Sequence, residues 1–384
     1  MKKTLHLALS KYEPIPPSLQ GATAGKAKAV IDLDLAGLYH HFYLDTYGTE
    51  PPSPDPAQFE HMRFLMPSDE FRFQSDGVGA STNAKRSKSS EMGQAFCRWF
   101  LHEHLGIKYF AHLDSLIGAT SANLHGYAVE RAAPGDIPDY LCSDGAGSVV
   151  IAEAKGRYTP VGFITEEFSR WRQQFTRVRV LDAAGNAVRV KGHVVATRFA
   201  TESKPKVQSK LYAEDPSTEG REPISTDTAL LLSGQVIASH YADVLMKLDQ
   251  PLMAYAIRRS LRLERQIGIP VTIWGFAFGG HERYFVGGYY ARDTDQSLID
   301  FVNGQITRRN SDPFRLGVHS GTFVGIELSV FKHLVSVARG DRRLLEALPE
   351  VDPVRDLYSG ISMLRDGSII GPLPMFTPLG LDRF

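Results

Sequence analysis

The chain has 384 residues, of which 43% are hydrophobic and 22% charged, a composition typical of a globular protein with a sizeable core. Lysine plus arginine equals aspartate plus glutamate, at 43 residues each, so no overall positive field draws nucleic acid to the protein. Two cysteines are too few for a disulfide framework, and the lack of clustered cysteine and histidine excludes a structural zinc site. No run of about eighteen apolar residues occurs, so we expect a soluble, cytoplasmic protein that makes no membrane contact.

The first part of the chain, residues 1–85, is rich in proline and holds one strong apolar segment, Ile31–Tyr43, which suits either a helix or a strand. We interpret this part as an N-terminal accessory region. It leads into residues 81–90, a polar and basic stretch that predicts a flexible loop. Basic side chains in such a loop suit contacts with phosphates, although a plain loop also explains the composition; the residues concerned are Lys85, Arg86 and Lys88.

A helix is predicted next, with Ser90 as its N-cap and Gly106 at its end. Glu91 opens this helix. Residues 107–113 and 125–131 are then expected to supply strands. Apolar side chains recur through the helix at helical spacing, at Met92, Ala95, Phe96, Trp99, Phe100 and Leu105.

The most informative stretch is a predicted hairpin, in which residues 138–142 return through a glycine-rich turn to the apolar strand 149–155. Side chains alternate along a strand, so Glu153 and Lys155 share one face. The turn brings Asp139 back towards Glu153, close enough for their carboxylates to meet. Two such carboxylates repel each other unless a cation lies between them.

This pair of carboxylates predicts a metal site. Carboxylate and carbonyl oxygens suit Mg²⁺ or Mn²⁺ rather than a softer metal, and Ala154 would add its backbone carbonyl to Asp139 and Glu153. Lys155 would orient a water or help to deprotonate it, while the metal stabilises charge on a phosphoryl oxygen. The chemistry that suits these residues is metal-assisted hydrolysis of a phosphodiester.

Pro138-Asp139, thirteen intervening residues and then Glu153-Ala154-Lys155 resemble the motif of the PD-(D/E)XK nuclease superfamily. The resemblance implies a core over residues 86–215 that runs helix, three-stranded meander, helix, strand. It also implies that Asp139, Glu153 and Lys155 are catalytic, with Glu91 as a further acid of the cluster. The alternative for Glu91 is that it only complements the helix dipole.

Downstream, Thr165 is the predicted N-cap of a helix over residues 166–178, the second helix of the expected core. Some members of the superfamily carry glutamine followed four residues later by tyrosine on this helix, but here Gln174 is followed by Val178. A last core strand is expected over residues 188–199. Gln174 and three arginines of this segment could contact phosphates, but a solvated basic face of the helix explains the arginines equally well. The arginines are Arg170, Arg172 and Arg177.

Residues 216–384 are predicted to form a C-terminal mixed α/β region. Two helices are expected over 230–248 and 251–266, where Pro251 suits a first helical position. A hairpin is expected from the aromatic segments 271–278 and 284–291.

The sequence therefore predicts an α/β protein: a restriction endonuclease-like core, with a mixed central sheet flanked by helices, an N-terminal accessory region and a C-terminal α+β region. The expected activity is Mg²⁺-dependent cleavage of DNA, in restriction, phage defence or DNA repair. A homodimer and a partner ATPase or defence-system protein are possible partners. Two alternatives stay open: a catalytically silent nuclease fold that binds nucleic acid or protein, and a structural or assembly protein in which the three charged residues form an ordinary ion-pair cluster.

Overall fold

The structure is a computed structural model that describes residues 2–46, 64–117, 127–182, 184–216, 226–278, 281–290, 299–302, 305–308, 322–354 and 361–384. The chain divides into two compact units. The first comprises Lys2–Thr46 and Glu60–His240, and the second Tyr241–Phe384. No helix within the described ranges is long and apolar enough to cross a membrane.

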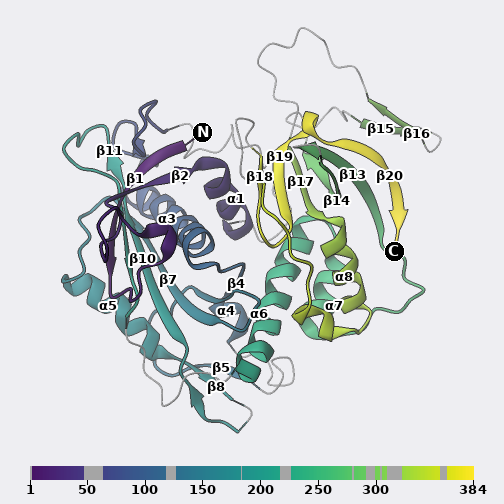
Figure 1. The fold of residues 1–384 in the computed structure, drawn as a ribbon, viewed down its shortest axis with the longest axis horizontal. Helices are drawn as coiled ribbons and strands as arrows, with labels where there is room; N and C mark the ends of the chain where they lie inside the picture. Colours follow the sequence, from purple (N-terminus) through teal and green to yellow (C-terminus); the bar gives the residue numbers. More distant parts are fainter. Residues whose placement is uncertain are drawn as a thin grey trace. The chain divides into compact units, whose positions relative to one another are not determined.

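A seven-stranded mixed sheet forms the centre of the first unit (Figure 1). Its strand order is β2-β1-β12-β10-β7-β6-β4. The β1–β12 and β7–β10 pairs are parallel, and the other pairs are antiparallel. The strands are β1 (Lys2–Ser10), β2 (Val30–Asp34), β4 (Tyr109–His112), β6 (Tyr140–Ser143), β7 (Val149–Arg157), β10 (Lys191–Arg198) and β12 (Lys210–Glu214).

The N-terminal strands belong to this sheet rather than to a separate accessory region. β1 pairs with β12 in the register His6↔Lys210, and β2 pairs with β1. The apolar segment that suited either a helix or a strand is both: β2 ends at Asp34, whose side chain accepts hydrogen bonds from the first turn of α1 (Leu35–Thr46). The units therefore divide differently from the boundaries expected at residues 85 and 215.

Helices cover both faces of the sheet (Figure 1). α1 and α3 (Thr82–Leu105) pack together, and α3 lies against β7 and β10. α5 (Glu166–Gln174) covers the other face, where its Phe168 and Trp171 pack on Val194 of β10. The unit also contains α4 (Leu113–Leu116), the 3₁₀ turns Pro17–Leu19 and Phe175–Arg177, and two small sheets formed by β3 (Arg72–Phe73) with β11 (Ala200–Thr201) and by β5 (Ala128–Arg131) with β8 (Val178–Leu181) and β9 (Ala187–Val188).

α3 begins nine residues earlier than the sequence suggested. Its N-cap is Ser81, whose side chain accepts a hydrogen bond from the backbone N–H of Ala84 at 3.2 Å, and it ends as predicted at Gly106, with φ +73°. The loop predicted for residues 81–90 is therefore wrong. That stretch lacks an apolar stripe because its side chains are mostly exposed, yet it contains no glycine or proline to interrupt a helix.

Other boundaries differ more modestly. Thr165 caps α5 as predicted, by accepting from the backbone N–H of Phe168, but α5 ends at Gln174 and Val178 already starts β8. The strand expected at residues 125–131 forms as β5, outside the central sheet, where it pairs with β8.

Two glycines let α3 lie directly on β7. A Cβ atom at Gly156 would come within 1.8 Å of the carbonyl oxygen of Ser89, and one at Gly93 within 2.3 Å of the backbone nitrogen of Gly156. No side chain therefore separates the helix backbone from the strand backbone at this crossing. Lys155, the residue before Gly156, is fixed relative to α3 by the same contact.

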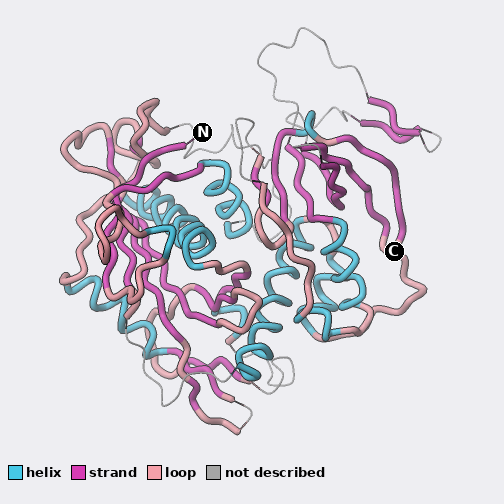
Figure 2. The backbone as a smooth tube through the Cα atoms, viewed as in Figure 1, coloured by secondary structure: helices cyan, strands magenta, loops and turns pink. Residues whose placement is uncertain are grey.

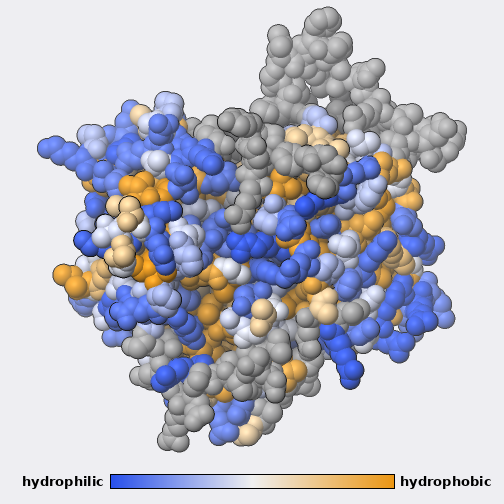
Figure 3. Space-filling view, viewed as in Figure 1, coloured by the Kyte–Doolittle hydropathy of each residue, from blue (hydrophilic) through white to orange (hydrophobic). Residues whose placement is uncertain are grey.

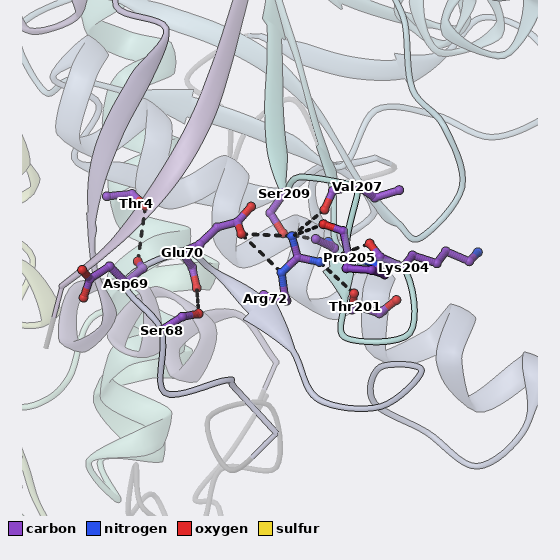
Figure 4. A network of polar contacts seen from close by, with 11 residues as sticks. Thr4, Ser68, Asp69, Glu70, Arg72, Thr201, Lys204, Pro205, Val207 and Ser209 are labelled. Carbon is purple, nitrogen blue, oxygen red and sulfur yellow. Dashed lines mark hydrogen bonds and ion pairs between the residues drawn. The ribbon is translucent and has the colours of Figure 1, made fainter.

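Arg72 ties the segment before α3 to the loop between β11 and β12 (Figure 4). Its guanidinium lies among carbonyl oxygens of that loop and donates to Thr201 at 2.8 Å and Val207 at 2.6 Å. It also pairs with Glu70, with 3.0 Å between Nη2 and Oε2. The planar guanidinium of arginine carries five N–H donors in a fixed geometry, which suits several acceptors spread around it, as here.

The second unit has a six-stranded antiparallel sheet with the order β18-β19-β17-β14-β13-β20. Its helices lie on one side of the strands in Figure 2. The elements are α7 (Pro251–Arg259), β13 (Pro270–Phe278), β14 (His281–Tyr290), β17 (Thr322–Glu327), α8 (Leu328–Ala338), β18 (Ser362–Met363), β19 (Ser368–Pro372) and β20 (Thr377–Arg383), with the hairpin of β15 (Ile299–Val302) and β16 (Gln305–Arg308) and the 3₁₀ turns Arg342–Glu346 and Leu373–Met375.

The sequence located the helices and the hairpin of this C-terminal region. α6 (Thr226–Lys247) crosses the boundary between the units, and α7 starts at Pro251 as predicted but ends near Ser260, whose φ is +58°. β13 and β14 form the expected hairpin. Hydrophilic residues cover much of the face in Figure 3, because many of the apolar side chains lie in the two cores.

We expect Gly156→Ala to destabilise the first unit by about 3 kcal/mol or more, because the new methyl group would overlap the backbone of α3. Gly288→Ala is the matched control, since a Cβ atom there meets nothing within 4 Å, and it should change stability by less than about 0.5 kcal/mol. Equilibrium urea unfolding measures both. Equal unfolding midpoints for the two variants would contradict the close approach of α3 and β7.

Candidate functional site

The β6–β7 hairpin brings Asp139 opposite Glu153. Its turn is held by Asp144, whose side chain accepts from the backbone N–H groups of Ala146 at 2.8 Å and Ser148 at 2.9 Å. The strands pair in the register Tyr140↔Ala152, so the residue before Tyr140 faces the residue after Ala152. This is the arrangement that the turn and the strand pattern predicted.

Asp139 is held by three elements. Its Oδ2 accepts from the backbone N–H of Ala154 at 2.8 Å, and its Oδ1 accepts from the side-chain amide of Gln94, on α3, at 3.4 Å. Its carbonyl oxygen accepts from the backbone N–H of Leu113, at the start of α4, at 2.9 Å. The carboxylate is thus oriented by hydrogen bonds on both oxygens.

Glu153 and Lys155 lie on the face of the sheet that α5 covers. In the parallel β7–β10 pair, Glu153 is in register with Val194, which packs against α5. Lys155 forms an ion pair with Oε1 of Glu153, and its Nζ lies 3.9 Å from Oδ2 of Asp139. The Glu153 side chain is 0% exposed, and its Oε2 has no hydrogen-bond partner among the described residues.

The three charges shift one another's protonation. Burial, together with the negative charge of Asp139, holds the pKa of Glu153 well above its usual range, and Lys155 only partly opposes this. Burial alone would lower the pKa of Lys155, but the two carboxylates outweigh it and raise that pKa. Lys155 is therefore a cation at neutral pH. With both acids ionised, two carboxylates and one ammonium leave the cluster one positive charge short, and the raised pKa of Glu153 is the response of the fold to that deficit.

A divalent cation fits this donor set. Mg²⁺ is commonly held by one or two carboxylates and keeps several waters. Asp139 and Glu153 would supply the carboxylates, including the buried oxygen of Glu153 that has no partner. The N–H and C=O of one strand residue point to the same side of the strand, so the carbonyl of Ala154 is directed to the same edge as the N–H that Asp139 accepts.

Glu91 does not join the two carboxylates. It lies in the interior of α3, where Ser87 donates to it at 3.2 Å and Lys88 at 3.4 Å. Within the described ranges, no group of three or more histidine, cysteine, aspartate or glutamate side chains is placed to hold a metal ion. The alternative of a dipole-complementing acid is also wrong, because the helix starts nine residues before Glu91.

Gln94 is the contact that sequence reasoning missed. It follows Glu91 by three residues on α3, which places both side chains on one helical face. The signal was available in principle, since this face also holds Arg98, four residues further on. A single half-buried amide carries little information, however, until the helix is placed against Asp139.

A second polar cluster flanks Asp139. Asp45, at the end of α1 and 2% exposed, accepts from the hydroxyl of Tyr140 at 2.7 Å and from Arg98 at 3.0 Å, and lies 3.3 Å from Nε2 of His112. Burial would raise the pKa of Asp45, but His112, Arg98 and Tyr140 lower it to about 2. Because Tyr140 directly follows Asp139 in the chain, this cluster also fixes β4 and β6 beside Asp139.

Most of the predicted phosphate contacts of α5 are engaged within the protein. Arg172 binds the buried Glu214 through two nitrogens, at 3.1 and 2.6 Å, so it is not available to a ligand. Arg170 pairs with Glu166 on the same exposed turn, at 2.5 Å.

The remaining predicted contacts divide between the interior and α3. Gln174 is buried, and Arg177 donates to the carbonyl of Asp136 at 2.8 Å. Lys85, Arg86 and Lys88 lie on the N-terminal half of α3, where Lys88 pairs with Glu91.

No protein family, no curated protein and no solved structure matches this chain. The geometry of the cluster is therefore the basis for interpreting the site.

We expect wild-type stability to fall relative to that of Glu153→Gln as the pH rises from about 4.5 to 8 in the absence of divalent cations. The folded protein holds the Glu153 proton more tightly than the unfolded chain does, because the pKa of Glu153 is raised from 4.5 on folding. The associated stabilisation is complete below pH 4.5 and is lost as the pH rises through the folded-state pKa. Glutamine has no proton to lose.

Urea unfolding across this pH range measures the effect. Glu166→Gln is the control, since it makes the same substitution at an acid that is 81% exposed. A constant difference between Glu153→Gln and wild type would show that the buried carboxylate keeps an ordinary pKa.

Proposed function

We propose that the protein is a Mg²⁺- or Mn²⁺-dependent deoxyribonuclease that hydrolyses phosphodiester bonds at Asp139, Glu153 and Lys155. The observation that carries the proposal is a pair of carboxyl groups: Asp139 and Glu153 face each other across a hairpin, and one oxygen of the buried Glu153 has no hydrogen-bond partner among the described residues. With both acids ionised, the cluster holds a charge that Lys155 does not compensate, and burying such a charge costs several kcal/mol. A ligand of opposite charge would remove that cost.

The order of elements within the central sheet and its helices supports a restriction endonuclease-like core. Leaving aside α4 and the small-sheet strands β5, β8 and β9, α3 is followed by the antiparallel strands β4, β6 and β7, then by α5, and then by β10, which is parallel to β7. This order is compatible with the helix, meander, helix, strand core that the resemblance implies. β1, β2 and β12 extend the same sheet, and Gln174 is not followed by the tyrosine of some relatives.

Each residue has a defined part in the proposed reaction. When bound, the metal would act as a Lewis acid towards a phosphoryl oxygen. Asp139, Glu153 and the Ala154 carbonyl would hold it, and the hydrogen bond from Gln94 orients Asp139. Lys155, which carries its proton at neutral pH, orients the attacking water as a hydrogen-bond donor and stabilises negative charge developing on the phosphate.

The ion pair between Lys155 and Glu153 favours a second candidate, a structural cluster in a protein that binds nucleic acid or a partner without cutting. Metal binding separates the candidates. A structural cluster has no need of Mn²⁺, whereas the proposed nuclease needs a divalent cation to polarise the phosphate. If the protein is a nuclease, its partners would include a second copy of the chain, an ATPase or a defence-system protein.

We expect purified protein to nick supercoiled plasmid and to cut linear duplex with Mg²⁺ or Mn²⁺. Asp139→Ala and Lys155→Ala should each lower the rate by about 100-fold or more, because each removes a group that holds the metal or stabilises the transition state. Glu166→Ala, an exposed acid on α5, should cut at the wild-type rate. Gel assays measure cutting, and titration calorimetry measures Mn²⁺ binding. Absence of both in the wild type would refute the nuclease proposal.

A further inference from the structure

The N-terminal half of α3 presents a polar face that leads to the proposed active site. Asn83, Ser87, Ser90 and Gln94 recur at intervals of four, three and four residues, so they follow one side of the helix. They line an open hollow of about 460 Å³ together with Arg86 and Glu91. We call the line formed by Asn83, Arg86, Ser87, Ser90 and Gln94 the α3 track.

The α3 track ends at the reactive cluster. Gln94, its last member, donates to Oδ1 of Asp139 at 3.4 Å. Alongside it, α3 lies on β7 at Gly156, directly after Lys155. A chain lying in the hollow would therefore lie beside Gln94, the residue that donates to the carboxylate of Asp139.

The charges along the track suit an anionic chain. Arg86 is exposed and forms no ion pair within the described ranges. This distinguishes it from Arg170 and Arg172, which pair with Glu166 and Glu214. The one acid of the hollow, Glu91, is neutralised by Lys88. The track therefore has a net positive charge.

The chemistry of the lining residues identifies which part of a nucleic acid it would contact. Hydroxyl, amide and guanidinium groups donate hydrogen bonds to phosphate oxygens, which carry no sequence information. No aromatic side chain is among the described residues that line the hollow, so these residues supply no aromatic ring on which a base could stack. The exposed charge of Arg86 therefore favours contact with the backbone.

We propose that the α3 track binds the sugar–phosphate backbone of the DNA strand on one side of the bond to be cut, independently of sequence, with Arg86 as the main phosphate contact. This inference rests on the proposed nuclease function. It assigns DNA binding to α3 and removes it from the arginines of α5.

Fluorescence anisotropy tests the proposal with two labelled duplexes of unrelated sequence, in EDTA so that no cutting occurs. Arg86→Ala should weaken binding of both duplexes by about 3- to 10-fold and reduce the dependence of log Kd on log salt by about one. Asn83→Ala should weaken binding without changing the salt dependence, because it removes no charge. Arg86→Lys should retain the salt dependence of the wild type.

The matched control is Arg170→Ala, which removes the same charge from an exposed position on α5 and should leave affinity unchanged. Urea midpoints equal to that of the wild type show that each variant is folded. If Arg86→Ala binds as tightly as wild type, or loses affinity for only one sequence, the assignment of the α3 track is wrong. Plasmid cutting by the wild type would then still support the nuclease function. A wild type that neither binds nor cuts DNA would instead overturn the nuclease function, and this inference with it.

Discussion

The candidate site depends on the contact between two backbones, where α3 crosses β7 at Gly93 and Gly156. With side chains at these positions the helix would be held away from the strand. Gln94 would then be carried away from Asp139, which it reaches at 3.4 Å. The distance between α3 and the carboxylate of Asp139 is thus fixed by two glycines, which have no functional side chain.

Near this crossing, two buried carboxyl groups have pKa values that are shifted in opposite directions. Asp45 is fully compensated, by Arg98, Tyr140 and His112, and its pKa is lowered to about 2. Glu153 is equally buried, but burial and Asp139 raise its pKa. Asp45 can therefore stay ionised as a structural anchor, whereas Glu153 is ionised only against the opposition of burial and of Asp139.

Local signals in the sequence predicted the hairpin, the Thr165 cap and the meeting of Asp139 with Glu153, because turn residues and strand alternation act over short distances. The start of α3 was not predictable from apolar periodicity, since its first half is mostly exposed. The pairing of Arg172 with Glu214, 42 residues apart, depends on the completed sheet, so no spacing rule reveals it. The role of Gln94 was not predictable for the same reason, because it depends on the hydrogen bond to Asp139 in the folded protein.

The parallel pairing of β1 with β12 has a consequence for how the chain folds. Its partners are about 200 residues apart, whereas the β6–β7 hairpin closes across a short turn. Distant pairing raises the contact order and slows folding, because the loop must close before any contact compensates for its entropy. During synthesis the β6–β7 hairpin can therefore form early, whereas one edge of β1 has no partner until β12 has been made. Until β12 is made, that open strand edge can pair with a neighbouring nascent chain.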